Sequence, residues 1–263
     1  MTETARTETR ETSETGKVGL EGRVLLTFAT WNPAAFLADF EADWGEVPEV
    51  VLKSEQGIVV AMNNAHFILR FVEGKDPDAE VVAKNNREWT GAADAAANHL
   101  AHIEVTSLLS PEAFVLRSAR DFVRVMASLA LQEGVVAIDT TNTLLTPEGY
   151  RNGAQVMTDG RSFPVHNVIF TGVWRSSEDG GTNGYTAGFN RFGLPELEIV
   201  DSKRGAYEVR EFLRNLSGYI LETGNPVRPD TTLRVSADEA FDVTLSAGVA
   251  FPEEIQTLKI AFG

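Results

Sequence analysis

Apolar residues along the chain alternate between continuous strand-like runs and spacings typical of helices. Residues Gly22–Ala29 form a run rich in valine, leucine and phenylalanine, which predicts a strand. Asn32-Pro33 follows, and this pair is typical of a helix N-cap with proline at the first helical position. The next apolar residues recur at helical spacing until Gly45, which favours a helix stop. The N-terminal part therefore predicts a strand followed by an amphipathic helix.

Four further segments predict helices by the same reasoning. Helix starts are indicated at Ser110-Pro111-Glu112 and at Thr146-Pro147-Glu148. An alanine-rich helix is expected from about Arg87, and another from Arg204 to Glu222. Each helix is apolar on one face only, so each requires a sheet or another helix to cover that face.

Strand candidates fill the segments between these helices. They are Val50–Lys53, Gly57–Met62, His66–Val72, Ala101–Leu108, Val135–Thr140, Val165–Arg175, Tyr185–Phe192, Glu196–Asp201, Thr232–Val235, Phe241–Leu245 and Leu258–Phe262. Short glycine- or asparagine-containing turns join many of them, which favours antiparallel pairing. We therefore predict an α+β protein with mixed or antiparallel sheets, built either as two ferredoxin-like modules or around one continuous sheet. The predicted division is an acidic Thr/Glu-rich tail over residues 1–18, an α+β module over 19–109 and a second over 110–263.

Composition narrows the function classes. The 263 residues include 38 Asp and Glu against 23 Lys and Arg, for a net charge of −15. Without a basic run, neither a nucleic-acid interface nor attachment to an anionic membrane is expected. No apolar run reaches the roughly 18 residues that a membrane-spanning helix needs, and the first residues lack the apolar stretch of a secretory signal. The chain has no cysteine, which excludes thiol catalysis, Cys-ligated metals and disulfides. We therefore expect a cytoplasmic location.

One cluster of potential catalytic or metal-binding residues is His99, His102 and Glu104. Imidazole and carboxylate groups are suitable zinc ligands, and they can also act as general acids or bases. His102 and Glu104 would share one face of a strand, with His99 at the preceding helix end. The HExxH pattern is absent. A structural corner, in which each ring hydrogen-bonds to backbone carbonyls, is the alternative.

Trp89, Glu196 and Glu198 are candidate binding residues. Glu196 and Glu198 would lie on one strand face, where two carboxylates could act as an acid–base pair. A solvated strand face is the alternative for these two residues. Trp89 begins the predicted helix that leads to His99 and His102, although tryptophans beside apolar stripes are usually core anchors. No nucleotide-binding glycine pattern and no nucleophile elbow occur in the chain.

Two segments together resemble an uncharacterised bacterial family, catalogued as a domain of unknown function. The first is Trp89 with Ala93 and the run His99-Leu-Ala-His102-Ile-Glu-Val, and the second is Thr186-Ala-Gly-Phe-Asn-Arg-Phe-Gly-Leu-Pro-Glu-Leu-Glu198. The resemblance extends from about Val24 to the C-terminus. It implies a bacterial cytoplasmic protein, and an association with secretion or toxin systems would suit an immunity protein or adaptor. It supplies no reaction.

These observations favour a non-enzymatic interaction protein that binds another protein. An acidic surface speeds the capture of a basic partner by electrostatic steering. The alternative is a metal-dependent hydrolase that uses the His99, His102 and Glu104 corner. We expect no cofactor, and the sequence leaves the oligomeric state open.

Overall fold

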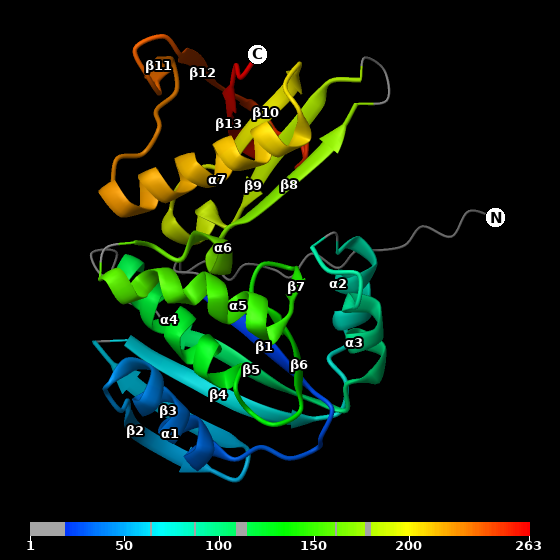
Figure 1. The fold of residues 1–263 in the computed structure, drawn as a ribbon, viewed down its shortest axis with the longest axis vertical. Coiled ribbons are helices and arrows are strands. Elements are labelled where there is room, and N and C mark those ends of the chain that lie inside the picture. Colours follow the sequence, from blue (N-terminus) through cyan, green and yellow to red (C-terminus); the bar gives the residue numbers. More distant parts are fainter. Residues whose placement is uncertain (1–18, 64, 87, 109–114, 161, 177–179) are drawn as a thin grey trace, which may run out of the picture.

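The chain folds into two β-sheets with helices packed on them, as the computed structural model in Figure 1 shows. It describes residues 19–63, 65–86, 88–108, 115–160, 162–176 and 180–263. Helices and strands occur in similar amounts and the sheets are antiparallel or mixed, so the predicted α+β class is confirmed. The predicted tail over residues 1–18 and the helix starts at Ser110 and Arg87 lie outside the described residues.

The first sheet has seven strands in the order β2-β3-β4-β5-β1-β6-β7. Their bounds are β1 Glu21–Leu26, β2 Glu49–Ser54, β3 Gly57–Met62, β4 Ala65–Glu73, β5 Ala101–Leu108, β6 Val135–Asp139 and β7 Leu144–Leu145. Every neighbouring pair is antiparallel. Antiparallel pairing agrees with the predicted sheet type, and the seven strands exceed the four of a single ferredoxin-like βαββαβ unit.

Helices cover the two faces of the first sheet unequally. One face packs on α1 (Pro33–Trp44), α4 (Val115–Leu129) and α5 (Pro147–Ala154), which lie in front of the sheet in Figure 1. In the part of the chain that the structure describes, the opposite face is covered only near β1, β6 and β7, by the short helices α2 (Ala79–Asn85) and α3 (Ala92–Asn98). The prediction missed α2, whose seven residues are too few for a clear helical period.

The second sheet has six strands in the order β11-β12-β13-β10-β9-β8. Their bounds are β8 Phe170–Arg175, β9 Thr182–Ala187, β10 Leu197–Ser202, β11 Thr231–Arg234, β12 Ala240–Ala247 and β13 Gln256–Ile260. β10 and β13 pair in parallel and the other neighbours are antiparallel. The long helix α7 (Ala206–Thr223) packs on β8 and β9. A side chain at Gly184 would lie 2.5 Å from Val209 of α7, so glycine allows this close approach.

Local signals placed most helix ends correctly. Asn32 accepts a hydrogen bond from the N–H of Ala34, and Gly45 ends α1 with a φ of 70°. Thr146 caps α5 by accepting from the N–H of Gly149. Two strand predictions included residues that form helices. Residues Val165–Val168 form the short helix α6, so β8 begins only at Phe170, and the predicted strand Tyr185–Phe192 ends in a 3-10 helix, η3 (Phe189–Phe192).

Both sheets contribute to one continuous hydrophobic core. β6 and β7 pair with the first sheet although they follow residue 110. The connection from the first sheet to the second contains η2 (Gln155–Asp159) and α6, and η3 (Phe189–Phe192) connects β9 to β10 within the second sheet. The predicted division into two modules between residues 109 and 110 stays a prediction. The first sheet contains strands from both sides of that boundary.

Candidate functional site

A polar cavity of about 490 Å³ lies on the first sheet where α2 crosses its partly covered face. Strands β1, β4 and β5 form its floor, and Val81, Val82 and Asn85 of α2 form one wall. The loop after β6 contributes Thr140 and Asn142. Pockets of a few hundred cubic ångströms with converging polar groups are typical of ligand sites, so this cavity is the candidate functional site.

A row of alternating charges crosses the cavity floor. Arg70 of β4 pairs in register with Glu104 of β5, Glu104 with Arg23 of β1, and Arg23 with Asp139 of β6. Cross-strand neighbours point to the same face of a sheet. Strand faces buried under helices are normally apolar, as they are farther along this sheet at Leu25. A charged row under α2 departs from that rule, and such departures concentrate at functional sites.

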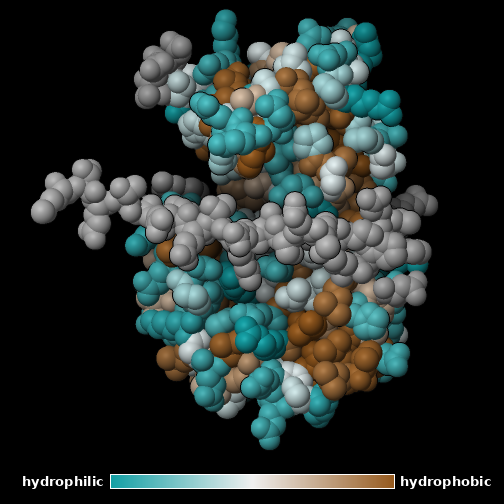
Figure 2. Space-filling view, turned by 180° about the vertical axis from the view of Figure 1, so that it is seen from behind, coloured by the Kyte–Doolittle hydropathy of each residue, from teal (hydrophilic) through white to brown (hydrophobic). Residues whose placement is uncertain are grey.

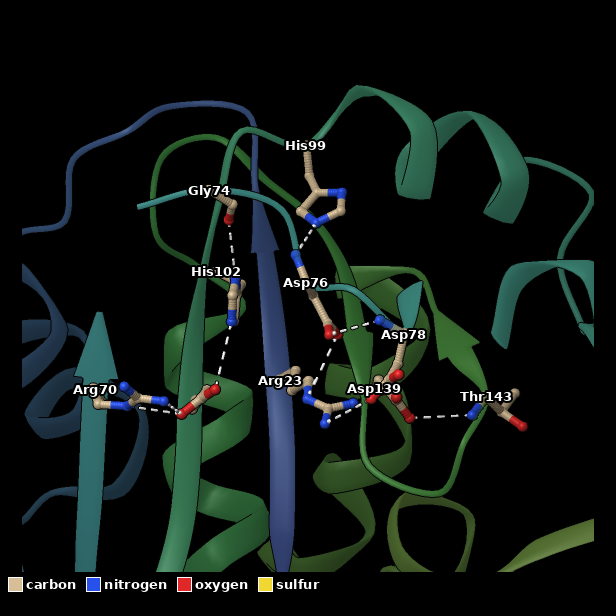
Figure 3. A network of polar contacts seen from close by, with 10 residues as sticks. Arg23, Arg70, Gly74, Asp76, Asp78, His99, His102, Asp139 and Thr143 are labelled. Carbon is tan, nitrogen blue, oxygen red and sulfur yellow. Dashed lines mark hydrogen bonds and ion pairs between the residues drawn. The ribbon is translucent and has the colours of Figure 1, made fainter. Parts of the chain in front are cut away.

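Arg23 holds the start of α2 against the sheet. Its guanidinium lies 3.5 Å from the Asp76 carboxylate and 3.3 Å from that of Asp78 (Figure 3). Asp76 also accepts a hydrogen bond from the N–H of Asp78. The Asp76 side chain is nearly fully buried, so Arg23 supplies the charge that its burial requires.

Asp139 and Arg191 lie at the β6 end of the cavity. Asp139 is 5% exposed and accepts a hydrogen bond from the N–H of Thr143 at 3.1 Å (Figure 3). Burial raises the pKa of the Asp139 carboxyl, since two backbone hydrogen bonds and the more distant Arg23 compensate only in part. Arg191, from η3, donates to the Thr140 carbonyl at 2.7 Å, and burial lowers the pKa of its guanidinium. Among the described residues, neither group forms an ion pair.

His99 is held by two backbone groups. Its Nε2 accepts the N–H of Asp76 at 2.8 Å, and its Nδ1 donates to the Ala96 carbonyl at 2.6 Å. The ring is fully buried, and this burial lowers the pKa of the imidazole. With both ring nitrogens in use, His99 has no lone pair for a metal. It fixes the loop after β4 to the end of α3.

His102 and Glu104 do lie side by side on β5, as their spacing predicts. His102 Nδ1 donates to the Gly74 carbonyl at 3.1 Å, and its Nε2 lies 3.6 Å from a Glu104 oxygen. Glu104 also accepts two hydrogen bonds from Arg70 (Figure 3). Burial acts to raise the pKa of Glu104, but Arg70 and His102 together lower it below its ordinary value. Within the described part of the chain, no three His, Asp or Glu side chains converge as a metal site would require.

Trp89 lies behind the cavity wall. It is partly buried and packs on the small apolar cluster that joins α2 and α3 to β1 and β6. Its ring lies against Gly91, where an added Cβ would approach the indole nitrogen to 2.6 Å. This contact is that of a core anchor for the helix pair.

Glu196 and Glu198 lie far along the chain in the second sheet, and protein groups occupy both carboxylates. Glu196 is 6% exposed and accepts from the Thr186 hydroxyl and from the N–H groups of Gly188 and Asn190. Burial raises its pKa despite these bonds. Glu198 is fully buried and bonds to Lys259, Thr257 and two backbone N–H groups. Burial acts to raise its pKa too, but Lys259 and the other donors lower it overall.

Sequence reasoning missed the residues that complete the cavity. Arg23, Asp139 and Arg191 are far apart in the chain and carry no motif of metal or nucleophile chemistry. A signal was present in β1 and β6, where a charged residue lies at one end of each apolar run: Arg23 precedes the run in β1, and Asp139 follows the run in β6. Arg191 also lies inside the second segment of the family resemblance.

Comparison with known families supports that resemblance over the C-terminal part of the chain. Residues 185–261 match the family model of a domain of unknown function, DUF4261, which confirms the resemblance to an uncharacterised domain family. This range contains all of the second segment and none of the first. No curated protein and no solved structure matches the chain significantly. No helix in the described residues has the length and apolar character to cross a membrane.

Proposed function

We propose that this protein is a non-enzymatic interaction protein that binds a basic protein partner. The observation that carries the proposal is the open half of the first sheet, where apolar side chains of β2, β3 and β4 have no helix over them among the described residues. A bacterial cytoplasmic setting, and an immunity-like or adaptor-like role, are part of the same proposal. The lack of cysteine in all 263 residues is compatible with that setting.

The open half of the sheet presents an apolar surface that α2 and α3 do not reach. Leu52 pairs in register with Val59, and Val59 with Ile68, so these three residues point to the uncovered side. Leu52 is 60% exposed, and Leu108 on β5 is 45% exposed. Figure 2 shows hydrophobic residues gathered on this side of the molecule, over its lower part. Exposed apolar patches on soluble proteins mark interaction sites.

Charge complementarity argues for a basic partner. The chain carries a net charge of −15, and an acidic protein attracts a basic one over distances comparable to the screening length. Steering raises the association rate, and the apolar surface then contributes to affinity. The hydrolase alternative gains no observation of its own, because His99 uses both ring nitrogens for backbone contacts.

The test is affinity purification from the native organism with matched surface variants. Wild type, Leu52→Asp and the control Val235→Asp are compared at low and high salt. Val235 is 52% exposed and lies near β11 of the second sheet, so it matches Leu52 in exposure but not in location. We expect a basic protein bound by wild type and by the control, weakened by salt and lost with Leu52→Asp. Equal retention by all three proteins, or self-association through this face in light scattering, would overturn the proposal.

A further inference from the structure

Two charged groups that line the cavity form no ion pair with any described residue. Arg23 pairs with Asp76 and Asp78, and Arg70 pairs with Glu104. Arg191 and Asp139 differ, since in the described structure the guanidinium meets only a backbone carbonyl and the carboxylate only backbone N–H groups. The negative charge of Asp139 acts to raise the pKa of Arg191 against the effect of burial, but the two side chains make no direct ion pair in the described structure. Buried charges normally have direct partners, so a ligand can still satisfy both groups.

The two groups lie at one end of the cavity. Arg191 donates to the carbonyl of Thr140, the residue that follows Asp139. A guanidinium retains several N–H donors after one such bond and recognises carboxylates with two of them. A carboxylate such as that of Asp139 accepts hydrogen bonds from an ammonium group. A ligand with a carboxylate and an ammonium group close together therefore satisfies both residues.

The rest of the lining restricts the ligand further. Asn85, Asn142 and Thr106 offer amide and hydroxyl groups, and the apolar part is small. The loop that presents Asn142 has a fixed shape, with Asn142 at a φ of 56° and Asp139 bonded to Thr143. A volume of about 490 Å³ accommodates a small molecule with a polar side chain and water.

We propose that this cavity binds a zwitterionic α-amino acid with a polar side chain. Arg191 holds the α-carboxylate, and Asp139 accepts from the α-ammonium group. A plain anion fits less well, because the Asp139 carboxylate also lines the cavity near Arg191 and would repel it. The cavity is separate from the open apolar half of the sheet. If the cavity bound no amino acid, the proposed protein interaction would therefore be unaffected.

The test is thermal-shift screening of the purified chain against each of the twenty standard L-amino acids, followed by calorimetry on the best. Three matched probes accompany that amino acid: its deaminated acid, its decarboxylated amine and inorganic phosphate. We expect binding of the amino acid only. Arg191→Gln and Asp139→Asn should each weaken binding by at least about tenfold, whereas Arg210→Gln, on α7 outside the cavity, should not.

Two results would overturn the proposal. Binding of phosphate or of the deaminated acid as tightly as the amino acid would make the cavity a simple anion site. If no amino acid changed the melting temperature of wild-type protein that circular dichroism shows to be folded, the cavity would not be an amino-acid site. Arg191→Lys, which can still donate to Thr140, covers the case in which Arg191→Gln fails to fold; a lysine lacks the paired donors, so it should also weaken binding.

Discussion

Asp139 in the first sheet and Glu198 in the second are both buried carboxylates on strands, but they have different surroundings. Glu198 meets an ammonium group, a hydroxyl and two backbone N–H groups, and its pKa is lowered. Asp139 meets only backbone N–H groups beside an open cavity, and its pKa is raised. Burial disfavours the charge of both residues, so their partners set the direction of the shift.

This difference separates a carboxylate with a structural role from one that can accept hydrogen bonds from a ligand. Glu198 ties β10 to β13 and to the loop after β12 through Val249 and Ala250. A ligand would have to displace those donors, which the fold itself supplies. Asp139 requires no such exchange. The same comparison distinguishes His99, which two backbone groups hold, from Arg191, which has donors remaining.

The largest expected effect is that of Glu198→Ala. The substitution leaves Lys259, Thr257 and two N–H groups without their acceptor in a fully buried position. Removing one partner of a buried ion pair costs about 3–5 kcal/mol of unfolding free energy. Urea denaturation at neutral pH measures this loss.

Glu239→Ala is the matched control for that substitution. Glu239 pairs with Arg204 at 2.9 Å, but its side chain is 47% exposed. Exposed ion pairs contribute about 0–1 kcal/mol, so the control should be nearly as stable as wild type. If the two variants lost the same unfolding free energy, the buried donors around Glu198 would contribute no more to stability than an exposed ion pair does.

His99→Ala is expected to have the next largest effect. It leaves the Asp76 N–H and the Ala96 carbonyl without partners in a buried corner. Each unsatisfied buried group costs about 1–3 kcal/mol, so we expect a loss of about 3 kcal/mol in urea. Metal content by elemental analysis should match wild type. Bound metal that disappears with His99 while stability is kept would restore the hydrolase alternative.

A third buried carboxylate, Asp121 of α4, gives an effect that depends on pH. Burial raises its pKa to about 6 from an ordinary 3.8, because hydrogen bonds from Asn63 and the charge of Arg124 compensate only in part. The folded state then binds the proton more tightly than the unfolded chain, so this group lowers stability as pH rises from 3.8 to about 6.

Asp121→Asn should remove that decline. The difference between variant and wild type should shift in favour of the variant by on the order of 2 kcal/mol across this window. Its absolute value also includes the lost attraction to Arg124. Urea melts at closely spaced pH values measure the slope. An unchanged slope would mean that Asp121 is better compensated than its contacts indicate.

The sequence predicted the elements well and the site poorly, for a physical reason. Helix caps and apolar periods are local, so Asn32, Gly45 and Thr146 marked helix ends correctly. His102 and Glu104 share a face because alternation on one strand is local as well. The charged row depends on the strand order β4-β5-β1-β6, which no local signal encodes. Whether Glu198 was solvated or buried depended equally on Lys259, sixty-one residues away in the chain.

The smallest expected effect is that of Glu104→Gln, at the open end of the charged row. Arg70 and Glu104 form an ion pair whose side chains are 55% and 33% exposed. The pKa of Glu104 is lowered, so its contribution is present at neutral pH and is lost as pH falls below the ordinary Glu value. We expect a cost below about 1 kcal/mol, shrinking further in high salt. Urea melts at two salt concentrations measure it. A cost above about 2 kcal/mol that did not change with salt concentration would show that the fold requires the Glu104 carboxylate, as it requires that of Glu198. In that case only Asp139, at the other end of the row, would have a carboxylate that a ligand can reach without displacing protein donors.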